Sequence, residues 1–191
     1  MSPASASKTA KRQSAQRGLV DNAQVTNTVH VRPAVPDDAT EIVAMIRELA
    51  DYERAVTEVV ATEHHLRRTL FAADPAVFAH VAETADGGLA GMAVWFRSYS
   101  TWLGTHNIYL EDLFVRPEHR GTGVGGLLLR TLAGICVERG YARLEWWVLD
   151  WNTPARDFYA ALGAEALTEW IPYRVSGDAL LRLAGAAKAD G

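Results

Sequence analysis

The sequence predicts an α/β (α+β) fold in which helices flank a mixed β-sheet within a single domain. Along the chain, strand-like and helix-like segments follow one another. In the strand-like segments every second residue is apolar, and in the helix-like segments apolar residues recur every three or four positions. The chain has 191 residues, of which 49% are hydrophobic and 22% are charged. Both shares are ordinary for a globular domain, so a fibrous or wholly disordered chain is excluded.

The first third of the predicted domain holds one strand and two helices. Residues 28–32 form a short strand, since valines alternate with polar side chains. Asp37 or Asp38 caps a helix that runs to about Tyr52 and carries one apolar stripe. A Thr followed by Glu opens a second helix over residues 62–71.

A hairpin, a fourth strand and a long helix follow. Strands over residues 77–83 and 89–99 flank the turn Asp86-Gly87-Gly88, which predicts an antiparallel pair. Residues 108–115 are a further strand, and residues 123–139 have the length and composition of a helix.

The last part of the chain continues the alternation. A strand is expected over residues 144–149, and a helix with Thr153 as its cap is expected over residues 153–162. A final strand pair is expected within residues 165–175, followed by a closing helix over residues 178–187. In a mixed sheet of this kind we expect a ligand site where neighbouring strands diverge.

Charge and composition restrict the function. Residues 1–27 are rich in Ser, Ala, Gln and basic side chains, which predicts a disordered leader before a domain over residues 28–191; an organellar transit segment has a similar composition. The net charge of -4 argues against nucleic-acid binding. No segment has the roughly 20 apolar residues that span a membrane. The single cysteine, Cys136, fits a reducing cytoplasm.

The strongest functional signal lies in residues 111–126. A strand ends there, Pro117 turns the chain, and Arg120 precedes a glycine-dense loop that opens a helix. Free N–H groups at a helix start favour a phosphate, and glycines let the backbone come close to it. A P-loop would need Gly-Lys-Ser/Thr, which is absent. A dinucleotide fingerprint would need its first glycine directly after the strand, with more βαβ units beyond it.

The pattern Arg120-x-x-Gly123-x-Gly125 after a strand resembles the acetyl-CoA pyrophosphate loop of the GNAT superfamily of N-acetyltransferases. Further segments are similar, in order, to the diamine (spermidine/spermine) acetyltransferase family. They are Arg32-Pro33-Ala34, residues 48–53, residues 109–112, residues 151–154, and Phe158-Tyr159 with Gly163-Ala164. The resemblance covers about residues 29–185. It implies a GNAT-like sheet, acetyl-CoA as co-substrate and a homodimer. No metal is expected, because His64 and His65 are adjacent on a helix and cannot share a face.

The resemblance also assigns the residues that would hold acetyl-CoA. Strand residues would pair with the pantetheine arm, the loop would hold the diphosphate, and the start of the helix near residue 153 would contact the arm's amides. The residues are Leu113, Phe114, Val115, Arg120, Gly121, Thr122, Gly123, Val124, Gly125, Gly126, Asn152, Thr153, Pro154 and Ala155.

Two residues are candidates for proton transfer. An alkylammonium with a pKa near 10.4 is charged at pH 7, so a proton acceptor is needed before the amine attacks a thioester. The resemblance implies Glu111 for this role, directly or through a water, and Tyr159 as the proton donor to the departing sulfur. In an unbulged strand Glu111 and Asp112 point to opposite faces.

The amine-binding region is expected to combine acids with aromatic faces, which suit an alkylammonium. Its candidate residues are Tyr52, Glu53, Trp102, Glu111, Asp112, Glu145, Trp146 and Trp147. Ser100 and Thr101 precede Trp102 where polyamine enzymes of the family carry an acid, which favours a diamine or a thialysine-like amino acid over a long polyamine. A non-catalytic acyl-CoA-binding module and a protein N-acetyltransferase are the alternative functions.

Overall fold

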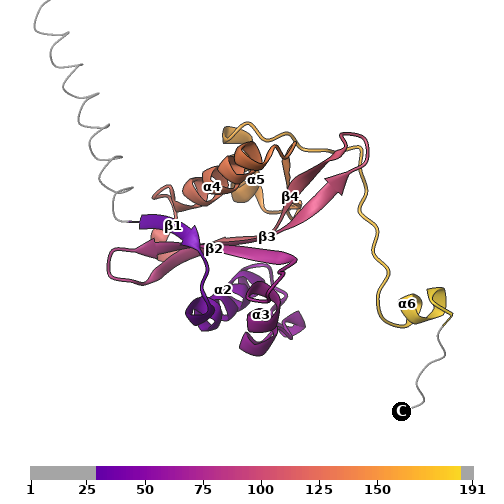
Figure 1. Ribbon diagram of the computed structural model, residues 1–191, viewed down its shortest axis with the longest axis horizontal. Coiled ribbons are helices and arrows are strands. Elements are labelled where there is room, and N and C mark those ends of the chain that lie inside the picture. The colour runs from indigo at the N-terminus through magenta and orange to yellow at the C-terminus, as the bar shows by residue number, and fades with distance from the viewer. Residues whose placement is uncertain (1–28, 186–191) are drawn as a thin grey trace, which may run out of the picture. The chain divides into compact units, whose positions relative to one another are not determined.

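Five strands form one sheet whose spatial order follows the chain (Figure 1). They are β1 (Val29–Pro33), β2 (Val77–Thr84), β3 (Leu89–Ser100), β4 (Thr105–Val115) and β5 (Leu144–Glu145). The first four strands pair antiparallel, and β5 pairs parallel to β4, so the predicted mixed sheet is confirmed. The computed structural model describes residues 29–185, and these belong to two compact units that adjoin in sequence after Trp147. The predicted leader over residues 1–27 lies outside the described residues.

Helices cover both faces of the sheet (Figure 1). One face carries α2 (Ala39–Tyr52) and α3 (Glu63–Leu70), and the other carries α4 (Val124–Arg139). Under α2 and α3 the core contains Ile42, Met45 and Met92, which are fully buried. None of the described helices is long and apolar enough to cross a membrane.

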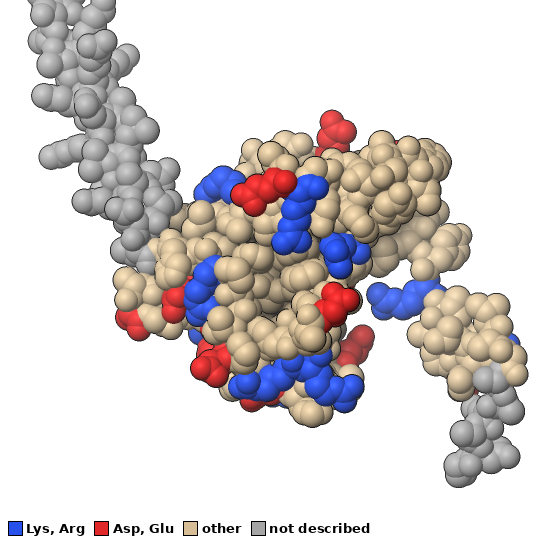
Figure 2. All heavy atoms as spheres, in the orientation of Figure 1, with Lys and Arg blue, Asp and Glu red and all other residues tan. Residues whose placement is uncertain are grey.

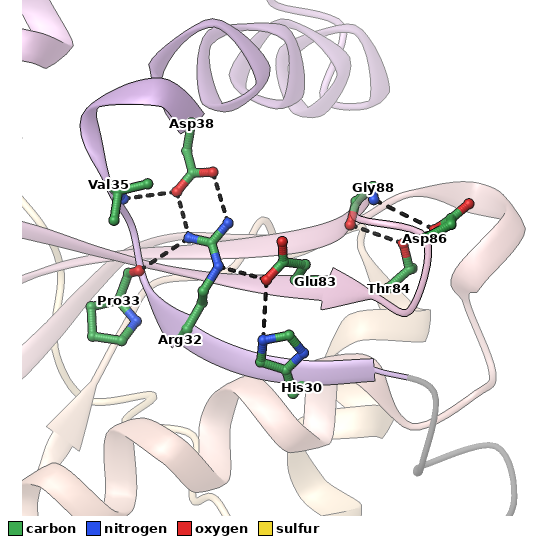
Figure 3. Close-up of polar contacts among 9 residues, drawn as sticks. All are labelled: His30, Arg32, Pro33, Val35, Asp38, Glu83, Thr84, Asp86 and Gly88. Atoms are coloured by element: carbon green, nitrogen blue, oxygen red, sulfur yellow. Dashed lines mark hydrogen bonds and ion pairs between the residues drawn. The ribbon is translucent and has the colours of Figure 1, made fainter.

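The start of α2 is anchored by a side-chain network rather than by an N-cap. A short 3-10 turn, η1 (Pro36–Asp38), precedes the helix. Asp38 was expected as a possible cap, but its carboxylate instead accepts hydrogen bonds from Arg32 at 2.7 and 3.0 Å and from the Val35 amide at 2.8 Å (Figure 3). Arg32 also donates to Glu83 at 2.7 Å, so β1, β2 and the start of α2 are held together.

The predicted hairpin between β2 and β3 is confirmed. The Thr84 amide donates to the Gly88 carbonyl at 2.8 Å, and the Thr84 hydroxyl donates to Asp86 (Figure 3). Gly87 has a φ of 86°, which a glycine adopts without strain. The helix predicted from residue 62 is likewise confirmed, because Thr62 accepts a hydrogen bond from the His65 amide at 3.3 Å.

The chain after α4 departs from the prediction in three places. Asn152, not Thr153, caps α5 (Thr153–Ala161), since its carboxamide oxygen accepts from the Ala155 amide at 3.3 Å. The strand expected over residues 144–149 ends at Glu145. The strand pair expected within residues 165–175 is wrong: the described residues contain no strand there, only a turn at residues 168–169 and irregular chain before α6 (Gly177–Leu183). A strand needs a partner edge, and alternation alone does not supply one.

Candidate active site

Helix α4 begins with free amides on a glycine turn. Gly123 precedes the helix with a φ of 93°, and no side chain caps the helix start. The amides of Val124, Gly125 and Gly126 occupy the first turn, where no intrahelical carbonyl can accept from them. A Cβ at Gly121 or Gly123 would meet open space. The loop is therefore an open cradle of N–H donors at the positive end of a helix, which suits a phosphate.

Arg120 lies between this loop and the end of α2. Its Nε donates to the Val115 carbonyl at 2.9 Å. Its guanidinium lies 5.1 Å from the centre of the Tyr52 ring and 5.6 Å from that of Phe114. The sequence prediction placed Arg120 on the diphosphate and Tyr52 in the amine site, and the structure brings the two side chains into contact.

Among the described residues of the unit that ends at Trp147, no strand pairs with this edge of β4 beyond Glu111, so the edge is open there. β5 pairs only with Ile108 and Tyr109 of β4, so the strands separate after this point. The Arg116 amide donates to the Ala90 carbonyl at 2.9 Å, which sets the pattern of bonds between β3 and β4. By alternation, the backbone groups of Leu113 and Val115 are directed away from β3, toward the open edge. These are the groups that an extended amide chain could pair with.

A β-bulge at Glu111 corrects the expected arrangement of the two acids. Asp112 pairs with Val94 and Leu110 pairs with Trp95, so Glu111 is an extra residue without a partner on β3. The strand is therefore not the unbulged one from which the placement of the two acids was predicted. Asp112 shares the face of Val94, which packs in the core under α2, while Glu111 is exposed on the bulge.

The bulge and the end of α2 bring three carboxylates together. Burial, reinforced by the charges of Glu111 and Glu53, raises the pKa of Asp112 to about 6. Burial also raises the pKa of Glu53, which directly follows α2. The effect of Glu111 and Glu53 on Asp112 requires close approach, because like charges disfavour ionisation only at short range. An ion of positive charge placed among these groups would relieve the repulsion.

Tyr109 extends the acidic region toward β5, and sequence reasoning gave it no role. Burial first, and then the charges of Glu111 and Glu145, raise its pKa. Its ring meets that of Trp147 edge to face, with centres 6.0 Å apart. Tyr109 and Glu145 are direct partners and so share a face. The signal that could have found Tyr109 is its place two residues before Glu111 in the same strand.

The other predicted acceptor residues differ in their placement. Glu145 is held by Arg143 at 3.1 Å. Trp147 is 64% exposed, Trp146 is half-buried, and Trp102 is 91% exposed on the turn between β3 and β4. The structure thus brings Tyr52, Glu53, Glu111 and Asp112 together. Tyr109 links Glu145 and Trp147 to this group. Trp102 lies apart from it on an exposed turn.

The remaining predicted residues belong to the C-terminal unit. Asn152 is buried and uses its carboxamide as the cap of α5, whose first turn contains Thr153, Pro154 and Ala155. Tyr159 is half-buried within α5, and its ring centre lies 5.3 Å from that of Phe158. Their part in the site remains a prediction.

An uncapped helix start after a glycine turn, beside a strand whose edge opens where its neighbour diverges, is the arrangement of an acyltransferase that uses a coenzyme thioester. The sequence agrees: residues 40–164 match the acetyltransferase (GNAT) family model. The chain belongs to this family and is an N-acetyltransferase.

Known proteins support both the family and the fold. Thialysine N-epsilon-acetyltransferase from Bos taurus is 41% identical over 167 residues, which cover 82% of this chain and 98% of the relative. L-ornithine N5-acetyltransferase from Arabidopsis thaliana is 31% identical, over 78% of this chain and 85% of the relative. An integron cassette protein from V. cholerae superimposes with a TM-score of 0.70 at 26% identity, covering 83% of this chain and 99% of that one.

Proposed function

We propose that this enzyme transfers the acetyl group of acetyl-CoA to a terminal primary amine of a small molecule, by direct attack in a ternary complex. The proposal rests on one observation: the carboxylates of Glu53, Glu111 and Asp112 lie together at the β4 bulge, next to the open edge of β4. Two relatives are named for thialysine and ornithine, amino acids that end in a primary amine. The preferred acceptor is therefore a diamine or a thialysine-like amino acid; a polyamine is the longer member of the same class.

The chain offers donors that fit acetyl-CoA. The free amides at the start of α4 would hold its diphosphate, and the backbone of Leu113 and Val115 would pair with the pantetheine arm. Residues 152–155 would complete the contact with the arm, as the family resemblance implies. When bound, the coenzyme supplies an activated acetyl thioester.

The acids would act on the amine in two ways. Asp112 and Glu53 attract and orient the ammonium group, since a cation lowers their mutual repulsion. Glu111, exposed on the bulge, takes the proton of the ammonium, directly or through a water, so that a neutral amine attacks. The ring of Tyr52 provides an aromatic face for the alkyl chain and the positive charge.

Tyr159 would supply the proton for the leaving thiolate. A phenol with a pKa near 10 is protonated at pH 7, yet close enough in acidity to a thiol to exchange a proton with it. The assignment rests on the family motif Phe158-Tyr159. No residue of the proposal acts as a nucleophile, so transfer is direct.

The exposed apolar residues of the C-terminal unit support a homodimer. Leu167, Trp170, Ile171 and Tyr173 are between 59% and 90% exposed. An extended apolar segment of this kind gains stability when a second copy covers it. Neither a nucleic acid nor a membrane is part of the proposed assembly. Because Cys136 is a free, buried thiol, we place the enzyme in the cytoplasm.

An acetylation screen with purified protein tests the proposal. Diamines, polyamines, thialysine, lysine, ornithine and peptide amines are offered with acetyl-CoA, and free CoA and acetylated product are both measured. We expect the highest kcat/KM for a short acceptor with a terminal primary amine. Turnover confined to peptide amines, or coenzyme binding without turnover of any amine, would refute the proposed substrate class.

A further inference from the structure

A pocket opens beside Pro33 and His80, the last paired residues of β1 and β2 at this end of the sheet. Its volume is about 300 Å³, at the small end of the range for ligand sites. Its walls come from β2, β3, the last turns of α3 and the C-terminal end of α4. None of its lining residues belongs to the loop over residues 116–126 or to the β4 bulge. It is therefore separate from the region assigned to the acetyl transfer.

A buried histidine supplies this pocket with a hydrogen-bond donor. His80 is only 8% exposed, and its Nδ1 accepts a hydrogen bond from Trp95 Nε1 at 3.1 Å. An indole can only donate, so the neutral imidazole must carry its proton on Nε2. Within residues 29–185 no group accepts a hydrogen bond from that Nε2. Among the described residues, the fully buried side-chain atoms without a partner are Ser98 Oγ and Asn107 Oδ1, so His80 Nε2 is accessible. Because His80 lines the pocket, a ligand with an acceptor atom would take this hydrogen bond there.

A positively charged side chain, that of Arg139, lines the same pocket as His80. Arg139, the last residue of α4, lines the pocket, and its guanidinium lies 6.0 Å from the centre of the Trp95 ring. Among the described residues Arg139 forms no ion pair. Burial first, and then the charge of Arg139, lower the pKa of His80, so the imidazole stays neutral and keeps a single N–H to donate. Arg139 would repel an amine but attract an anion.

The rest of the pocket is apolar. Phe78 stacks on Trp95 with ring centres 4.5 Å apart, and Phe71 and Ile135 complete the lining around them. Only a molecule with one anionic end and a compact apolar body matches both halves of this surface. A phosphate or a nucleotide would leave the aromatic walls in contact with polar groups.

We propose that this pocket binds a small carboxylate whose other end is aromatic or branched aliphatic. The carboxylate accepts hydrogen bonds from His80 Nε2 and from the guanidinium of Arg139, and the apolar body packs against Phe78, Trp95 and Ile135. Because the acceptor and coenzyme residues lie elsewhere, this site operates whether or not the proposed amine is the true substrate.

Calorimetry and NMR with the full chain test the site. The probes are benzoate, 3-phenylpropionate, indole-3-acetate and 4-methylvalerate, each matched with its neutral primary amide. We expect at least one acid to bind saturably, with its amide at least about tenfold weaker, because a charge-assisted hydrogen bond is lost. In ¹⁵N-labelled protein, the His80 imidazole and Trp95 indole resonances should shift with the same affinity.

Two matched variants localise the binding. Arg139→Gln should weaken the acid about tenfold, whereas Arg68→Gln removes the same charge from an exposed position on α3 outside the pocket and should change nothing. Both positions are exposed, so folding is preserved. Absence of saturable binding for all four acids, equal affinity in Arg139→Gln, or competition with acetyl-CoA would each overturn the proposal.

Discussion

Replacing Asp112 by Asn should stabilise the enzyme at neutral and alkaline pH while it weakens acceptor binding. Asp112 is held beside Glu53 and Glu111 with a pKa of about 6, raised by burial and by its two neighbours. The folded chain therefore binds this proton more tightly than the unfolded chain does. The linkage relation then requires stability to fall as the pH rises from about 4 through about 6.

The size of the effect follows from the two pKa values. A shift from 3.8 in the unfolded chain to about 6 in the folded chain costs about 3 kcal/mol once both states are ionised, near pH 8. Solvent and relaxation around the group lower this figure, so about 1.5 to 3 kcal/mol is expected. At pH 5 the folded carboxyl is mostly protonated, and the cost drops to about half. Asn keeps the size and polarity of the side chain without the charge.

Urea unfolding of wild type and Asp112→Asn at pH 5 and pH 8 measures the difference. The variant should gain more free energy of unfolding at pH 8 than at pH 5, and its KM for the amine should rise at pH 8. Asp74→Asn is the matched control, since Asp74 is exposed on the loop between α3 and β2. A variant that is no more stable than wild type at pH 8, or a gain that is the same at both pH values, would refute the assigned environment of Asp112.

Three other substitutions test separate parts of the site. Tyr159→Phe should lower kcat about 10²-fold or more with acetyl-CoA affinity nearly unchanged; unaltered turnover would remove the phenol from the mechanism. Glu111→Gln should lower kcat and change the shape of the pH–rate profile, and a profile like that of wild type would place proton acceptance elsewhere. Gly123→Ala, at a φ of 93°, should cost about 1 to 2 kcal/mol in thermal or urea unfolding and weaken acetyl-CoA. Gly134→Ala, within α4 and facing open space, should instead stabilise by up to about 1 kcal/mol, and equal effects of the two would contradict the role of the left-handed turn.

Most of the sheet and helix order could be predicted because those elements depend on local signals. The hairpin turn at Asp86-Gly87-Gly88 and the cap at Thr62 each specify their geometry within a few residues. The segment over residues 165–175 failed for the opposite reason. Its alternation resembles that of a strand, but a strand also requires a partner edge, which the local sequence does not encode.

The sequence motifs of the site could be predicted, but the spatial arrangement of its acidic side chains could not. The glycine turn at Gly123 and the open helix start follow from residue type, and the structure has them where the sequence placed them. The bulge at Glu111 depends on the register between β3 and β4, which involves residues nearly twenty positions apart. For the same reason the sequence could not show that Asp112 is buried beside Glu53, or that Tyr109 borders the acids.

The acids at the bulge repel one another, so something must prevent α2 from moving away from β4. Arg116, which follows β4, donates to Glu41 at 2.7 Å and to Glu48 at 3.4 Å, and thereby ties the end of that strand to α2. At the other end of the same turn, Arg120 stacks on Tyr52, the residue just before Glu53. Both arginines belong to the segment that leads into the anion cradle at the start of α4. The cradle proposed for the coenzyme and the carboxylates proposed for the acceptor are therefore both positioned by one short segment. A mobile α2 would let the pKa of Asp112 fall toward its ordinary value.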